Sequence, residues 1–369
     1  MKRTNPVTRL AIVFLLMLSF MPLGVAHISR VSAQGTDCAT GGTGNAGASP
    51  AAATPETAAS PATAPAGINA AYVPKDIVNG YFVGGFKGAQ DAAAETGGTV
   101  QQVGPDTPDA AGQVQFIQTL TQQGVQAIGV SANDPNALAP ALKDAMGKGI
   151  KVVSYDSDVA PDARNVFVNT ANSEDIGRIQ IQIISRLIGC SGEIAILSAA
   201  STATNQNAWI GFMKDELTKP GYENVKLVDV VYGDDKPQLS YDKTVELLTA
   251  YPDLKGIVSP TTVGIANAAA ALEAEGRTDV KLTGLGLPNE MRQYLKDGTV
   301  TEMALWNPID LYYLTYYVQA ALVSGEITGA EGDTFTAGRL GSYTVGKNGE
   351  VLLGLPFIFT KDNVDQFDF

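Results

Sequence analysis

Short apolar runs alternate with longer helical patterns along the chain from Ile68 onward. The runs are rich in Val and Ile and about four to eight residues long, which is typical of buried strands. Strict alternation of strand and helix predicts parallel sheets with helices on both faces. About ten predicted strands are more than one such sheet usually holds. The sequence therefore predicts an α/β protein of two doubly wound parallel-sheet domains.

The predicted elements cover the chain as far as residue 324. Strands are expected at 70–73, 98–103, 127–131, 151–155, 165–169, 193–198, 225–231, 256–259, 281–285 and 301–306. Helices are expected at 81–95, 109–123, 136–147, 173–187, 205–218, 237–250, 264–275, 289–297 and 308–324. In the tail, two apolar runs at 340–345 and 350–358 flank Lys347-Asn348-Gly349, a pattern that predicts a β-hairpin. We expect this hairpin to cap a sheet or to run across the hinge.

The first residues have the pattern of a targeting segment. Three basic residues precede the apolar run 10–25, and Val31-Ser32-Ala33 offers a small-x-small cleavage pattern. The run is short for a membrane span. Residues 34–67 are mostly Ala, Thr, Ser, Pro and Gly, a composition that cannot bury a core. We therefore predict a signal peptide at 1–33, a disordered tether at 34–67, and export to the periplasm or cell surface.

The inventory of charged and reactive residues excludes several kinds of protein. The only histidine, His27, lies within the predicted signal peptide. A mature chain without histidine cannot form Ser-His-Asp or Cys-His catalytic arrangements, and zinc loses its commonest nitrogen ligand. A net charge of −13 without a basic run argues against nucleic acid as a partner. Gly84-Gly85 with Gly88 lies inside a helix pattern and is weak evidence for a phosphate loop. We expect no cofactor and no metal.

Two cysteines, Cys38 and Cys190, remain in the predicted mature chain. Exported proteins keep disulfides, so a bridge between these two residues is one interpretation. A lipid anchor on Cys38 is another, although the preceding residues 35–37 are polar where a lipidation signal needs an apolar residue. Two free thiols are the third interpretation.

Asp156 and Asp158 follow directly after the predicted strand 151–155. In open parallel sheets, ligands bind outside the carboxyl ends of the strands. The two carboxylates could bind a ligand, cap a turn, or act as the acid pair of a glycoside hydrolase. Two carboxylates two residues apart on one turn are more often solvated separately than placed on opposite sides of a glycosidic bond. We therefore favour ligand binding, with Asp156 the stronger candidate.

The other strand ends carry amide, hydroxyl and aromatic side chains. Neutral sugars offer hydroxyl groups as donors and apolar C–H faces, so this mixture fits a sugar site. Trp209 and the four tyrosines at 312, 313, 316 and 317 are expected to pack in the core. The candidate ligand-binding residues are Lys75, Asn79, Tyr81, Phe82, Asp156, Asp158, Asn205, Gln206, Pro260, Thr262, Trp306 and Asn307.

A set of short motifs occurs in order from about Ile68 to Phe369, over the whole predicted folded part. With these motifs the chain resembles type I periplasmic sugar-binding proteins of ABC importers, and in particular the subgroup that binds rhamnose and autoinducer-2. The motifs are Val73-Pro74-Lys75, Tyr155-Asp156-Ser157-Asp158, Thr204-Asn205-Gln206-Asn207-Ala208-Trp209, Ser259-Pro260-Thr261-Thr262-Val263-Gly264, Leu287-Pro288-Asn289, Ala304-Leu305-Trp306 and Lys361-Asp362-Asn363.

The resemblance bears on the ligand. The autoinducer-2 pattern has a lysine, an aspartate, an Asp-Gln pair, and a proline with an alanine two residues later. Asn205 stands in place of an aspartate and Thr262 in place of the alanine, and both departures favour a deoxyhexose such as rhamnose. An autoinducer-2 receptor remains the alternative. The matching positions are Lys75, Asp156, Gln206 and Pro260.

The resemblance also implies two lobes with a ligand cleft between them. The N-terminal lobe would comprise 68–169 and 307–329, and the C-terminal lobe 170–306 and 330–369. The chain would cross between the lobes near Asn169, Trp306 and Gly329. The implied protein is a monomer, not an enzyme, that closes on a small sugar and delivers it to the membrane permease of an ABC transporter. A histidine-free glycoside hydrolase is a distant alternative.

Overall fold

The computed structural model describes Cys38 and residues 66–369. The predicted signal peptide, with His27, lies outside the described residues, and so does most of the predicted tether. Within the described part, no helix combines the length and apolar character needed to span a bilayer.

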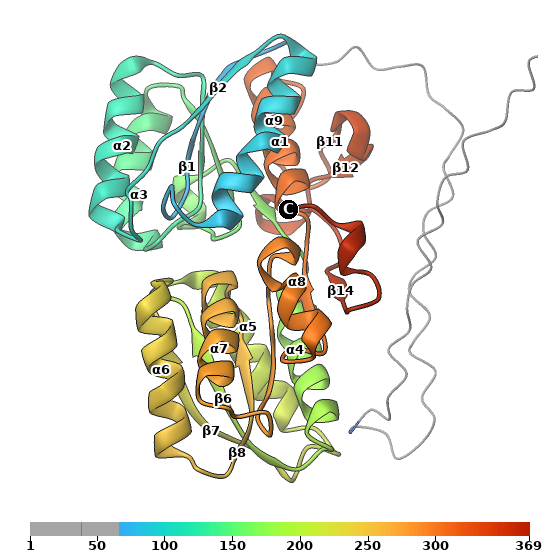
Figure 1. Cartoon of the computed structure of the whole chain (residues 1–369). Coiled ribbons are helices and arrows are strands. Elements are labelled where there is room, and N and C mark those ends of the chain that lie inside the picture. The colour runs from blue at the N-terminus through green and yellow to red at the C-terminus, as the bar shows by residue number, and fades with distance from the viewer. Residues whose placement is uncertain (1–37, 39–65) are drawn as a thin grey trace, which may run out of the picture. The chain divides into compact units, whose positions relative to one another are not determined.

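The first lobe is built on a six-stranded sheet with the order β13-β5-β4-β3-β1-β2, and its pairings are parallel. Helices α1 (Gly80–Thr96) and α9 (Pro308–Ser324) pack together on one face, and α2 (Ala110–Gln123) and α3 (Pro135–Gly147) on the other (Figure 1). The strands are β1 (Asn69–Val73), β2 (Thr99–Gln102), β3 (Ala127–Val130), β4 (Lys151–Tyr155), β5 (Val166–Asn169) and β13 (Glu350–Leu352).

The second lobe has a parallel sheet with the order β7-β6-β8-β9. Strand β10 (Met303–Leu305) joins β9 through a bridge between Leu285 and Ala304, and it pairs antiparallel with β14 (Phe357–Phe359). The other strands are β6 (Gly192–Ser198), β7 (Val225–Tyr232), β8 (Leu254–Ser259) and β9 (Lys281–Gly284). The helices are α4 (Ser173–Leu187), α5 (Thr204–Leu217), α6 (Pro237–Ala250), α7 (Thr262–Ala274) and α8 (Pro288–Asp297). The predicted fold class, two doubly wound α/β sheets, is confirmed.

Every strand and helix predicted as far as residue 324 is present, with ends shifted by no more than two residues. Local chemistry explains this agreement. Asparagine and aspartate side chains accept backbone N–H groups at the starts of five helices, which satisfies donors that have no partner in the helix. Four helices end on a glycine in the left-handed conformation. The caps are Asn79, Asp109, Asp134, Asn172 and Asn307, and the glycines are Gly97, Gly124, Gly298 and Gly325.

The tail differs from its prediction. Strand β12 (Ser342–Thr344) pairs with β11 (Thr334–Thr336), so the predicted hairpin between 340–345 and 350–358 is wrong. Residues 347–349 form a turn of 3-10 helix, η3, and β13 then pairs in parallel with β5. The run 350–358 cannot be one continuous strand because Gly354 and Pro356 interrupt it. Parts of that run therefore join two different sheets.

The lobe boundary in the tail also differs from its prediction. The chain leaves the first lobe after Asn169 and returns to it after Leu305 with helix α9. It joins the first sheet again only at β13. The third crossing lies between Leu352 and Phe357, and the prediction of a crossing near Gly329 is wrong. Residues 350–352 therefore belong to the first lobe and not to the second.

Cys38 and Cys190 form a disulfide, with their Cα atoms 5.6 Å apart. A sulfur bonded to another sulfur cannot also carry a lipid, so this pairing disagrees with the lipid-anchor and free-thiol interpretations. The bond attaches a residue that precedes the first lobe to the second lobe. A disulfide of this kind fits a protein that works in an oxidising compartment.

Candidate ligand-binding site

A cavity of about 30 Å³ lies where the strand ends of the two lobes face each other. The lining combines charged, amide, hydroxyl and aromatic side chains from both lobes. The lining residues are Lys75, Asn79, Tyr81, Phe82, Asp156, Gln206, Trp209, Asp235, Pro260, Thr261, Thr262, Leu285, Leu305 and Trp306.

The topology of the two sheets brings these residues together. In the first sheet the strand order reverses between β1 and β3, and Lys75 lies two residues beyond β1. In the second sheet the order reverses between β6 and β8, where Gln206 and Pro260 follow the strands. Neighbouring strand ends diverge at such a reversal and leave a crevice for a ligand. Each lobe therefore offers a crevice to the shared cavity.

Asp156 is held at the end of β4 by several donors. Its side chain is buried, Ser131 Oγ donates to Oδ2 at 2.7 Å, and Tyr81 Oη donates to Oδ1 at 3.3 Å. Asn205 Nδ2, from the other lobe, also donates to Oδ1 at 3.4 Å. Burial raises the pKa of the Asp156 carboxyl, while the Lys75 ammonium and the donors lower it. The site thus positions a carboxylate in a place where water cannot fully solvate it.

Lys75 connects the lobes. It is buried, and its Nζ donates to Asn205 Oδ1 at 3.2 Å and to Gln206 Oε1 at 3.3 Å, both on α5 of the second lobe. An ammonium has three donors, and the described residues accept from two of them, which leaves one for a ligand. The Thr202 hydroxyl adds a further contact between lobes, at 2.9 Å from the Asn133 carbonyl oxygen.

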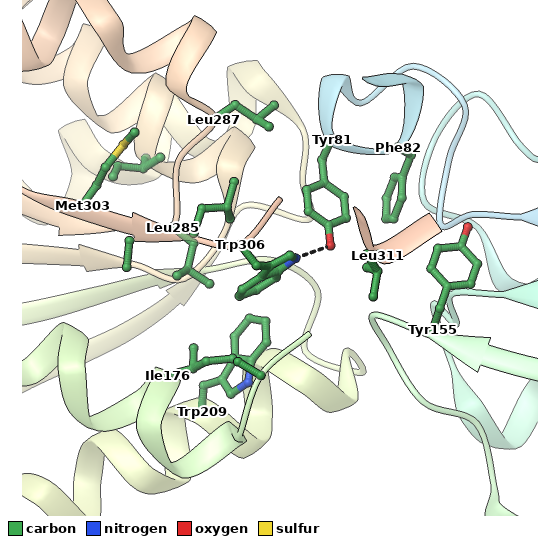
Figure 2. Close-up of a cluster of buried hydrophobic side chains, with 14 of the residues drawn as sticks. Tyr81, Phe82, Tyr155, Ile176, Trp209, Leu285, Leu287, Met303, Trp306 and Leu311 are labelled. Atoms are coloured by element: carbon green, nitrogen blue, oxygen red, sulfur yellow. Dashed lines mark hydrogen bonds between the residues drawn. The ribbon is translucent and has the colours of Figure 1, made fainter. Parts of the chain in front are cut away.

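Aromatic rings form another wall of the cavity. Trp306 Nε1 donates to Tyr81 Oη at 2.7 Å, and the Trp306 ring lies between Tyr81 and Trp209 (Figure 2). The centroids of Trp306 and Trp209 are 5.7 Å apart, and Phe82 packs edge-on against Tyr81 at 5.1 Å. Such rings provide apolar surface for the C–H face of a sugar. Trp209 is buried, as expected of a core residue, but it also lines the cavity.

Nine of the twelve predicted residues line the cavity, and Asp158, Asn205 and Asn307 do not. Asp158 Oδ1 instead accepts from Arg164 Nε at 2.7 Å, so its side chain holds the turn. The predicted hydrolase pair with Asp156 is therefore not formed. Asn307 accepts from Ile309 N and caps α9. Asn205 does not line the cavity, but it contacts the two lining residues Lys75 and Asp156.

Five lining residues were missed by the sequence analysis. Asp235 follows β7, so the same rule of strand ends that selected the other residues could have found it. Thr261 stands between two residues that were selected. Leu285 and Leu305 are apolar ends of strand patterns and carry no local sign of a binding role. The fifth is Trp209.

The comparisons with known proteins agree with this geometry. Residues 70–327 match the family model of the periplasmic binding protein domain. The structure of a sugar ABC transporter from Actinomyces odontolyticus is 46% identical, with a TM-score of 0.67 over 81% of this chain and 97% of that one. An ABC transporter solute-binding protein from Clostridium phytofermentas with bound L-rhamnose is 40% identical, with a TM-score of 0.79 over 82% and 98%. LsrB from Clostridium saccharobutylicum in complex with AI-2 is 28% identical, with a TM-score of 0.77 over 81% and 99%.

Proposed function

This chain belongs to the family of periplasmic binding proteins, and from that premise we propose that it captures L-rhamnose or a similar deoxyhexose for an ABC importer. The family comprises sugar-binding transport proteins and not enzymes. We also propose that the chain is exported to the periplasm or cell surface, acts as a monomer, and docks on a membrane permease.

One observation carries the choice of a neutral sugar. The cavity pairs a fixed carboxylate, Asp156, and an ammonium, Lys75, with the aromatic wall of Trp306 and Trp209. Sugar hydroxyls can donate to the carboxylate and accept from the ammonium, while the C–H face packs on the rings. A deoxyhexose also has a methyl group, for which the apolar lining at Leu285 offers a place. The 40% identical neighbour with L-rhamnose supports the same choice.

Autoinducer-2 is the second candidate, and it has its own support. The four positions that match its pattern, Lys75, Asp156, Gln206 and Pro260, all line the cavity. However, Asn205 replaces a carboxylate, and its Oδ1 accepts from Lys75. Thr262 lines the cavity with a bulkier side chain than the alanine of the pattern. A ligand rich in hydroxyl donors would therefore find fewer acceptors and less room.

Binding would work by closure of the lobes. Lys75 and Asp156 come from the first lobe and contact α5 of the second, so a ligand between them touches both lobes. A ligand can favour the closed state only by its stronger binding to that state. The permease would then recognise the closed form.

A panel of sugars tests the ligand. Purified protein is titrated by calorimetry and followed by thermal shift with L-rhamnose, other deoxyhexoses, D-ribose and autoinducer-2. We expect L-rhamnose to give the largest rise in melting temperature, because a ligand that binds only the folded state stabilises it. A larger rise with autoinducer-2 would favour the second candidate. No response to any of these compounds would refute the ligand assignment.

Gly80 tests the closure step without changing the cavity lining. A Cβ atom at Gly80 would lie 2.7 Å from Glu290 Oε1 and 3.3 Å from Leu287 Cδ1, both in the second lobe. Both atoms are at the ends of flexible side chains that can move away from a Cβ atom, so the larger leucine is used. We expect Gly80→Leu to hold the lobes apart and to weaken L-rhamnose binding about tenfold, or about 1.4 kcal/mol. Gly84→Leu is the matched control, because a Cβ atom at Gly84 has no neighbour within 4 Å. Equal affinities of the two variants, measured by calorimetry, would refute the prediction.

A further inference from the structure

Three charged side chains line the cavity: Lys75, Asp156 and Asp235. Within the described residues, the hydrogen bonds of Lys75 Nζ go to the two amide oxygens of Asn205 and Gln206 and not to a carboxylate. A cluster that served only stability would bring the ammonium into contact with a carboxylate, because contact offsets the cost of removing charges from water. Here the charges face a shared space and do not pair directly.

Asp235 enters this space from the second lobe. It follows β7, and its backbone is left-handed, with φ 51°. Asp156 at the end of β4 has the same conformation, with φ 60°. Residues other than glycine rarely adopt positive φ, and such conformations concentrate at binding sites. The two lobes thus each present to the cavity one aspartate whose backbone is left-handed.

The contacts of Asp235 fix one oxygen and leave the other for a ligand. The Thr261 hydroxyl donates to Oδ1, and no described residue donates to Oδ2. Thr261 also lines the cavity and precedes α7. The alternative is that Asp235 only holds this turn. However, a residue that only holds its turn need not line the cavity, as Asp235 does.

We propose that Asp235 is a second ligand-binding carboxylate, and that with Asp156 it makes the site select neutral sugars over acidic ones. The inference rests on the proposed function and deepens it. Two carboxylates against one ammonium leave excess negative charge in the lining, so a carboxylate on the ligand would be repelled. A hydroxyl of a neutral sugar can instead donate to Oδ2 of Asp235.

The electrostatic surroundings agree with this assignment. Burial raises the pKa of Asp235, and so does the negative charge of Asp156, while Lys75 and the Thr261 hydrogen bond lower it. A raised pKa means that the ionised form is less favourable in the folded protein than in the unfolded chain. The ligand-free protein therefore gains no stability from this charge at neutral pH, which is expected of a group that serves binding.

The experiment compares Asp235→Asn with Asp234→Asn. Asp234 is the neighbouring residue and also has positive φ, and among the described residues its carboxylate pairs only with Lys236, at 3.8 Å. Asparagine tolerates the left-handed conformation, so both variants should fold. Each protein is titrated by calorimetry with L-rhamnose as the neutral probe and with D-galacturonate and D-glucuronate as acidic probes. Melting temperatures without ligand are recorded in parallel.

We expect Asp235→Asn to weaken L-rhamnose binding by at least about tenfold and Asp234→Asn to leave it within about twofold. The wild type should bind neither uronate, and the ligand-free Asp235→Asn variant should melt no lower than the control. Unchanged affinity in Asp235→Asn, or tight uronate binding by the wild type, would overturn this inference but not the proposed function. A fall in melting temperature without loss of affinity would also overturn it, because Asp235 would then only hold its turn. A wild type that binds no neutral sugar would overturn the proposed function and the inference with it.

Discussion

Replacing Asp156 with asparagine is expected to weaken sugar binding by about 1.5–3 kcal/mol, or roughly 10- to 150-fold. Ser131, Tyr81 and Asn205 all donate to the carboxylate. In an asparagine, an NH₂ group replaces one of the two carboxylate oxygens and would face at least one of these donors. The amide would also offer fewer acceptors to the hydroxyls of the ligand. Calorimetric titration with L-rhamnose measures the effect.

Loss of stability should not account for this loss of affinity. Burial raises the pKa of Asp156 in the folded protein above its value in the unfolded chain. The protonated carboxyl group therefore contributes fully to stability only at pH values below the unfolded-chain pKa. That contribution is lost as the pH rises through the folded-state pKa. At neutral pH asparagine therefore removes an unfavourable charge. The affinity of the variant for the sugar should fall, but the unfolding free energy of the ligand-free variant should not.

Asp158→Asn is the matched control on the same turn. Its carboxylate pairs with Arg164 outside the cavity, and that guanidinium is largely buried. We expect this variant to lose stability, because Arg164 loses its partner, and to keep its affinity for the sugar. Equal losses of affinity in the two variants would contradict the distinct roles assigned to Asp156 and Asp158.

Replacing Gly88 with alanine is expected to lower the unfolding free energy by about 3 kcal/mol, the upper end for overpacking a core. Helices α1 and α9 pack closely here, and a Cβ atom at Gly88 would lie 1.8 Å from the Ile309 carbonyl oxygen. That oxygen belongs to the backbone, so the clash can be relieved only if a helix shifts. Denaturant unfolding at equilibrium measures the change.

Gly84→Ala is the control for this prediction. Gly84 lies one turn earlier in α1, where a Cβ atom has no neighbour within 4 Å. Alanine should stabilise the helix there by up to about 1 kcal/mol. The prediction for Gly88 is wrong if the two variants unfold at the same denaturant concentration. A confirmed difference would assign the glycine cluster of α1 to helix packing, and not to a phosphate loop.

Local patterns in the sequence predicted most of the fold. The apolar runs, the Asn and Asp caps and the closing glycines act within a few residues, and their strands and helices are found where expected. The rule that ligands bind at strand ends then selected Lys75, Asp156 and Gln206, which line one cavity although they lie far apart in the chain. Parallel strands align their carboxyl ends, so the rule holds without knowledge of the packing.

The sequence by itself therefore determined the two parallel sheets and most residues of the site. Only the tertiary structure separated Asp156 from Asp158, because Arg164 holds the second carboxylate away from the cavity. Only the tertiary structure also shows that the tail pairs with both lobes, through β13 with β5 and through β14 with β10. The same holds for the position of Asp235 in the cavity lining. These outcomes depend on partners distant in the chain, such as the free edge of β5. Spacing along the chain carries no information about which of several possible partners is adjacent in space.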